Sequence, residues 1–190
     1  MSQILQISLI IHILSGLAGI VSFTAFVLLI SRKEFDLKKL KIYSVLGTVS
    51  FFITWIAGGY YYTLYYGGSV KPLIVGGALP WAHKVVMESK EHLFLMLPFL
   101  SLAVMAVVFV YGMQFAQNQA LTWALSKVTI ALTGIAIFMA VAGFAISGSV
   151  RKTQVSNFES CAKAGYQILE SFPRMCVTPD GQIFTEVINE

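Results

Sequence analysis

The stretch HKVVMESKEHLFLMLPFLSLAVMAVVFVYGMQF, residues 83–115, joins a charged segment to a long apolar run. Its first ten residues carry two histidines, two lysines and two glutamates, and an apolar run from Leu93 to Phe115 follows them. This run exceeds the roughly 20 residues that a helix needs to cross a hydrocarbon core about 30 Å thick. Because lipid offers no hydrogen-bond partners to an open backbone, we expect a transmembrane helix here.

Three more runs of this kind lie at residues 4–30, 42–66 and 121–146. Apolar residues make up 57% of the 190 residues and charged residues 12%, whereas a soluble globular protein carries about 25% charge. Because so few charged residues cannot cover a surface that faces water, we expect lipid to cover most of the surface of this chain. The sequence therefore predicts an all-α bundle of four transmembrane helices within residues 1–149, at about residues 4–30, 42–66, 81–116 and 120–148.

Basic residues predict the orientation of this bundle. Five of the thirteen lysines and arginines fall within residues 32–41, directly after the first apolar run. The positive-inside rule places such a loop in the cytoplasm. We therefore expect a multi-pass protein of the cell (plasma) membrane with both termini extracytoplasmic. The same clustering indicates the lipid bilayer, and not nucleic acid, as the partner of the basic charge.

The residues after Ser149 have a different composition and predict a small separate module. Residues 150–190 are polar and contain the only two cysteines, Cys161 and Cys176. An even pair in an extracytoplasmic tail predicts a disulfide. Residues 178–181, Thr-Pro-Asp-Gly, are a turn signal. We expect a hairpin formed by residues 174–177 and 182–187, preceded by a short helix from Phe158 to Leu169.

The string CAKAGYQILESFPRMCVTPDGQIFTE, residues 161–186, resembles a cysteine-paired module that recurs in small prokaryotic exported and membrane-anchored proteins. The matching positions are Cys161, Ala164-Gly165-Tyr166, Glu170-Ser171, Pro173-Arg174, Cys176 and Pro179-Asp180-Gly181. The resemblance implies an extracytoplasmic location for the tail and carries no activity.

Small and aromatic residues predict how the helices pack and where they end. Gly16 and Gly19 in the first span, and a stripe of Ala136, Ala140, Gly143 and Ser147 in the fourth, are expected to form packing seams. The tyrosines at positions 60–66 are expected to form an aromatic belt at the membrane interface. We expect His83, Lys84 and Lys90 to lie in a solvated start of the third helix.

Two histidines stand apart because they lie at or inside the membrane boundary. His12 has apolar residues on both sides, and His92 directly precedes Leu93. They are nine and eleven residues from the expected outer ends of their helices, so we expect them at a similar depth in the outer leaflet. Pro98 frees the carbonyl group of Phe94 and should bend the third helix beside His92.

This placement leaves three interpretations open. His12 and His92 can be the axial ligands of a haem b, since in histidine placement the chain is similar to membrane b-type cytochromes. They can instead join Glu88 or Glu91 as ligands of a transition metal. They can also be hydrogen-bonded polar groups in a bundle without a cofactor.

Each interpretation corresponds to one function. With a haem b, the chain is a small electron-transfer protein, and with a transition metal it is a metal-binding protein. Without a cofactor, it is an accessory or structural subunit whose tail binds a protein of a membrane complex or of the extracytoplasmic space. No nucleophile or hydrolytic motif points to another enzyme class.

Overall fold

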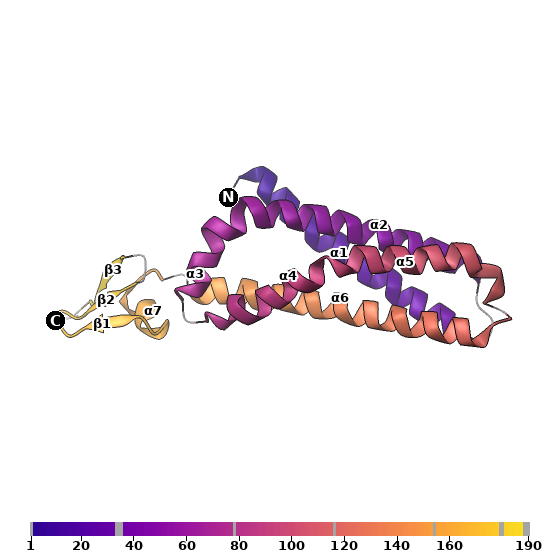
Figure 1. Cartoon of the computed structure of the whole chain (residues 1–190). Helices are drawn as coiled ribbons and strands as arrows, with labels where there is room; N and C mark the ends of the chain where they lie inside the picture. The colour runs from indigo at the N-terminus through magenta and orange to yellow at the C-terminus, as the bar shows by residue number, and fades with distance from the viewer. Residues whose placement is uncertain are drawn as a thin grey trace. The chain divides into compact units, whose positions relative to one another are not determined.

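A computed structural model describes residues 2–32, 36–77, 79–115, 117–153, 155–178 and 181–187, with the backbone alone for 151–153. Four helices are long and apolar enough to cross a membrane, namely Gln3–Ile30, Leu37–Val75, Ala82–Gln114 and Gln119–Val150 (Figure 1). This confirms the four predicted spans in number and order. The chain divides into two compact units, residues 1–64 with 90–141 and residues 65–89 with 142–190.

The second span begins earlier and extends further than its apolar run predicts. Helix α1 covers Gln3–Ile30, and α2 covers Leu37–Tyr61. Asp36 caps α2, because its Oδ1 accepts hydrogen bonds from the backbone N–H groups of Lys38 and Lys39 at 2.9 and 3.3 Å. These hydrogen bonds lower the pKa of the Asp36 carboxyl group. Beyond α2 the chain continues as a π-helix, η1 (Tyr62–Val70), and a short helix, α3 (Lys71–Val75).

Helices α1 and α2 pack closely because each places a glycine opposite a phenylalanine of the other. A Cβ atom on Gly19 of α1 would lie 2.4 Å from the Phe51 ring of α2, and one on Gly47 of α2 would lie 2.5 Å from the Phe23 ring of α1. The two rings are stacked, with centroids 5.5 Å apart. This reciprocal contact confirms that Gly19 belongs to a packing seam.

The third span is divided into four helical segments. They are a π-helix η2 (Ala82–Met87), the α-helices α4 (Glu88–Phe94) and α5 (Met96–Tyr111), and a 3₁₀ turn η3 (Gly112–Gln114). The interruption between α4 and α5 falls at Leu95. Pro98 has no N–H group to donate to the carbonyl of Phe94, and this explains the interruption. The expected disturbance of the helix beside Pro98 is therefore present.

The fourth span is α6 (Gln119–Thr153), and its first part belongs to the core of the first unit. Buried side chains from the four spans form this core. They are Phe23, Phe26, Ile30, Leu40, Phe51, Leu97, Val104, Val108, Phe115, Leu125, Leu132, Ala136 and Met139. The predicted small-residue stripe is only partly right, since Ala136 is buried but Ser147 is exposed.

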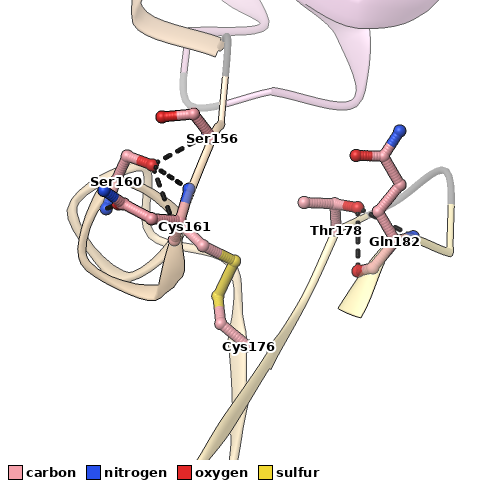
Figure 2. Close-up of a disulfide and its surroundings, with 7 residues drawn as sticks. Ser156, Ser160, Cys161, Cys176, Thr178 and Gln182 are labelled. Carbon is pink, nitrogen blue, oxygen red and sulfur yellow. Dashed lines mark hydrogen bonds between the residues drawn. A yellow bond between two sulfur atoms is a disulfide. The ribbon is translucent and has the colours of Figure 1, made fainter. Parts of the chain in front are cut away.

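The tail is a three-stranded antiparallel sheet with one short helix. Helix α7 covers Phe158–Lys163, and the strands β1 (Gln167–Leu169), β2 (Met175–Val177) and β3 (Ile183–Thr185) lie in the order β1-β2-β3. Figure 2 shows the predicted disulfide, which joins Cys161 of α7 to Cys176 of β2. The hairpin between β2 and β3 is also confirmed, although residues 179 and 180 of its turn lie outside the described residues.

The predicted helix from Phe158 to Leu169 is too long, and its last residues form β1 instead. Gly165 has a φ of +79°, and the N–H groups of Gly165 and Tyr166 bond to the carbonyls of Ala162 and Cys161. This is a Schellman cap, in which a glycine in the left-handed conformation ends the helix.

An ion pair joins the beginning of β2 to the end of β3. Nε of Arg174 donates to Glu186 Oε2 at 2.7 Å, its second nitrogen bonds the other carboxylate oxygen, and the N–H of Glu186 donates to the carbonyl of Arg174 at 2.8 Å. The hydrogen bonds from Arg174, together with its charge, lower the pKa of Glu186.

Acidification should therefore weaken this end of the tail. Because the pKa of Glu186 is lower in the folded state, the pair stabilises the tail above the ordinary glutamate pKa of about 4.3. That stabilisation is lost as the pH falls through the lower folded value. We expect the protection factor of the Glu186 amide in hydrogen exchange, corrected for the intrinsic rate, to fall below about pH 4. Arg174→Gln should remove this pH dependence, and an unchanged profile in that variant would show that another group is responsible.

Candidate functional site

His12 lies in the contact between α1 and α2. Its Nδ1 is 2.9 Å from the carbonyl oxygen and 3.0 Å from the hydroxyl oxygen of Thr54, and that hydroxyl donates to the carbonyl of His12. The ring is half-buried and rests against Gly58, where a Cβ atom would lie 2.5 Å from Nδ1. A carbonyl oxygen can only accept, so Nδ1 carries the proton at this contact.

Helix α4 contacts the last part of α2 and the first residue of η1. Glu91 Oε1 accepts a hydrogen bond of 2.7 Å from the hydroxyl group of Tyr62, and the Phe94 ring lies 6.3 Å from the ring of Trp55. His92, between these two contacts, is exposed on α4. The helices that carry His12 and His92 therefore both meet residues 54–62. His12 is bonded to Thr54 of α2, and His92 is exposed on α4.

The four residues of the predicted metal site do not form one cluster. Among the described residues, no group of three or more His, Cys, Asp or Glu side chains could hold a metal ion. Glu91 is engaged with Tyr62, and Glu88 is exposed on α4. The part of the chain that the structure describes therefore gives the metal interpretation no support.

Trp55, the residue of α2 that follows Thr54, lies among three other aromatic rings. Trp55 lies against Phe52, Phe94 and Phe99, with ring centroids 6.1 to 6.4 Å apart. Within the described ranges, Trp55 Nε1 is the buried side-chain nitrogen or oxygen that has no hydrogen-bond partner. A buried donor without an acceptor is unusual in a folded protein. The sequence analysis did not single out this residue.

The second unit holds a buried pair that the sequence analysis assigned wrongly. Tyr66 and His83 are each 3% exposed, and the Tyr66 hydroxyl lies 3.0 Å from His83 Nδ1. His83 is thus not solvated, and Tyr66 is not simply part of an interfacial belt. Both residues lie on π-helical turns, where i→i+5 bonding turns side chains away from the face that an α-helix predicts.

Lys84 is exposed, as predicted, and Lys90 is half-buried. The solvated start expected for the third helix therefore holds for Lys84 but not for His83.

Comparison with protein-family models, with curated proteins and with solved structures finds no match to this chain.

Proposed function

We propose that this chain is a small electron-transfer protein of the membrane, with His12 and His92 as axial ligands of a haem b. The observation that carries the proposal is the hydrogen bond from His12 Nδ1 to the Thr54 carbonyl oxygen. A histidine that binds a metal usually donates its other ring N–H to a carbonyl or carboxylate, which fixes the tautomer and the ring orientation. With the proton on Nδ1, Nε2 of His12 has a lone pair for iron.

Two features of α2 support the same interpretation. The helix of His12 bonds to Thr54, and the helix of His92 contacts Trp55, the next residue of α2. Aromatic rings cluster beside these contacts, and they are Phe52, Trp55, Phe94 and Phe99. Trp55 Nε1 is a buried hydrogen-bond donor without an acceptor among the described residues. A haem has a flat apolar ring and carboxylate groups that accept hydrogen bonds. When bound, it supplies a one-electron carrier.

The absorption spectrum of the purified protein tests this proposal. We expect a Soret band, with sharp visible bands on reduction by dithionite, in protein made with haem supplied. Protein that shows no Soret band after incubation with hemin would contradict the proposal. If such colourless protein held a stoichiometric metal ion that Glu88→Ala or Glu91→Ala removed, the metal interpretation would replace it.

A second candidate is an accessory subunit without a cofactor, and interhelical hydrogen bonds favour it. The Ser8 hydroxyl donates to the Ala57 carbonyl at 2.8 Å, the Thr48 hydroxyl donates to the Ser101 carbonyl at 3.0 Å, and Thr54 engages His12. In this case His12 is one of several polar groups that join α1, α2 and α5, and the tail binds a partner protein. Protein with neither a Soret band nor bound metal would support this candidate.

The proposed orientation puts the basic loop in the cytoplasm and both termini outside the plasma membrane. Lys38→Cys and Ser69→Cys test it, since both positions are exposed and the two native cysteines are joined in the disulfide. On intact cells, an impermeant maleimide should label Ser69→Cys and should reach Lys38→Cys only after lysis, because the basic segment is retained inside. Labelling of Lys38→Cys on intact cells would reverse the orientation.

A further inference from the structure

The two faces of the tail sheet have different surroundings. Ile168, Cys176 and Phe184 are direct cross-strand partners and therefore share one face. Helix α7 lies on this face, because the disulfide joins its Cys161 to Cys176 (Figure 2). Cys161 and Cys176 are both 0% exposed. The disulfide is therefore the buried centre of this face, while Ile168 at its edge strand is 39% exposed.

The opposite face is mostly apolar and carries no charge. It presents the side chains at the alternate strand positions. They are Gln167, Leu169, Met175, Val177, Ile183 and Thr185. Leu169 and Ile183 are 38% and 59% exposed. Among the residues described, α7 is the one helix of the tail, and it lies on the other face. No helix of the described tail therefore covers these side chains, of which Met175 and Val177 are half-buried.

Two more exposed apolar side chains lie at one end of the sheet, the end that also carries the Arg174–Glu186 ion pair. The register pairs Leu169 with Met175 and Met175 with Thr185, so the loop 170–174 and the residues after β3 leave the sheet at the same end. Phe172 in that loop is 91% exposed, and Val187 after β3 is 83% exposed. We call the six apolar residues the apolar tail surface. They are Leu169, Phe172, Met175, Val177, Ile183 and Val187.

The size of this surface argues against a stable protein interface. Three strands about 4.8 Å apart and three residues of about 3.3 Å each make a sheet face of roughly 10 by 10 Å. A stable protein–protein interface buries about 800 Å² on each partner. A bilayer sets no such minimum area, since its affinity for a peripheral element grows with the apolar area that the element inserts.

The chain also keeps this surface near lipid. The apolar part of the fourth span reaches Val150, α6 ends at Thr153, and α7 begins at Phe158. The five Cα–Cα steps from Thr153 to Phe158 reach at most about 18 Å. A tethered surface meets the bilayer at a high effective concentration, so even a weak affinity suffices. We propose that the apolar tail surface inserts into the lipid bilayer surface beside the end of α6.

Photo-crosslinking in the full-length protein tests this proposal. Benzoylphenylalanine replaces Phe172 in one variant and Glu159, an exposed residue of α7, in a second. A third variant carries it at Phe144, which lies on α6 and is 74% exposed. The proteins are reconstituted into vesicles of phosphatidylcholine, whose headgroup has no net charge, and mass spectrometry identifies the adducts. We expect phospholipid adducts at positions 172 and 144 and none at 159.

Every other outcome at position 172 overturns the proposal. A crosslink to a second copy, to another segment of the same chain or to a co-purified protein would identify a different occupant. The absence of a lipid adduct at 172, when 144 forms one, would show that the surface faces water. Lipid adducts at both 172 and 159 would show that lipid contact does not depend on this face.

Charge on the surface supplies a second test. Leu169→Glu combined with Ile183→Glu should reduce the lipid adduct at position 172 by about tenfold or more, because two carboxylates replace two apolar side chains that insert into lipid. Gln182→Glu, an exposed position between β2 and β3, should leave the yield unchanged. Free-thiol titration confirms in each variant that the disulfide has formed. An equal yield in all variants would contradict the proposal.

Discussion

Gly19→Ala and Gly47→Ala should each destabilise the helical bundle by about 1–3 kcal/mol, the range measured for overpacked cores. The added methyl group would lie within 2.4 Å of the Phe51 ring at Gly19 and within 2.5 Å of the Phe23 ring at Gly47. Both rings are buried, at 2% and 0% exposure, so neither can move aside without disturbing the core. The loss should appear as unfolding at a lower fraction of sodium dodecyl sulfate, measured by circular dichroism in mixed micelles.

Gly59→Ala is the matched control for this experiment. Gly59 also lies in α2, but a Cβ atom there meets nothing within 4 Å. Because alanine favours a helix over glycine by about 1 kcal/mol, this variant should be as stable as the parent or more stable. Phe51→Leu should reduce the cost of Gly19→Ala, since the clash is with the ring. Equal unfolding curves for Gly19→Ala and the parent would show that α1 and α2 do not approach closely at this point.

If His12 and His92 bind a haem as proposed, His12→Ala and His92→Ala should each abolish its low-spin spectrum, because the iron loses an imidazole ligand. Gly58→Ala should disturb the same spectrum without removing a ligand, since its methyl group would lie 2.5 Å from His12 Nδ1. Gly59→Ala again serves as the control, and its spectrum should match that of the parent. The variants are compared as purified and after reduction.

His83→Gln separates ligation from general damage. His83 is buried against Tyr66, and a glutamine in its place retains a polar atom that can form a hydrogen bond with the Tyr66 hydroxyl group. This variant should keep the full haem spectrum. A parent-like spectrum in His92→Ala would show that His92 is not a ligand. Loss of haem in His83→Gln but not in His92→Ala would show that His83 is the second ligand.

The length and composition of the apolar runs predicted the four spans because lipid imposes a single backbone solution on such runs. The helix ends were harder to predict because they depend on capping. Asp36 starts α2 at Leu37, and Gly165 ends α7 before β1. Both signals are present in the sequence: an aspartate lies within the basic segment, two residues before Lys38, and a glycine lies in the string AKAGY. They could have been used.

The environment of individual side chains could not be predicted in the same way. An α-helical reading puts His83 among solvated charges, but the π-helical turns of η1 and η2 bring it against Tyr66. Nothing in the sequence around Trp55 marks its N–H group as unpartnered. The sequence identified His12 from its apolar surroundings. The Thr54 contact that fixes its tautomer joins residues 42 positions apart and needs the folded pair of helices.

Near-infrared magnetic circular dichroism of the oxidised wild-type protein tests the central claim most directly, because its charge-transfer band reports the axial ligands of low-spin haem. For His12 and His92 as ligands, the account predicts the band of bis-imidazole ligation, with one haem for each chain. A high-spin signal, a band for ligation by one imidazole and another group, or the absence of haem would contradict it.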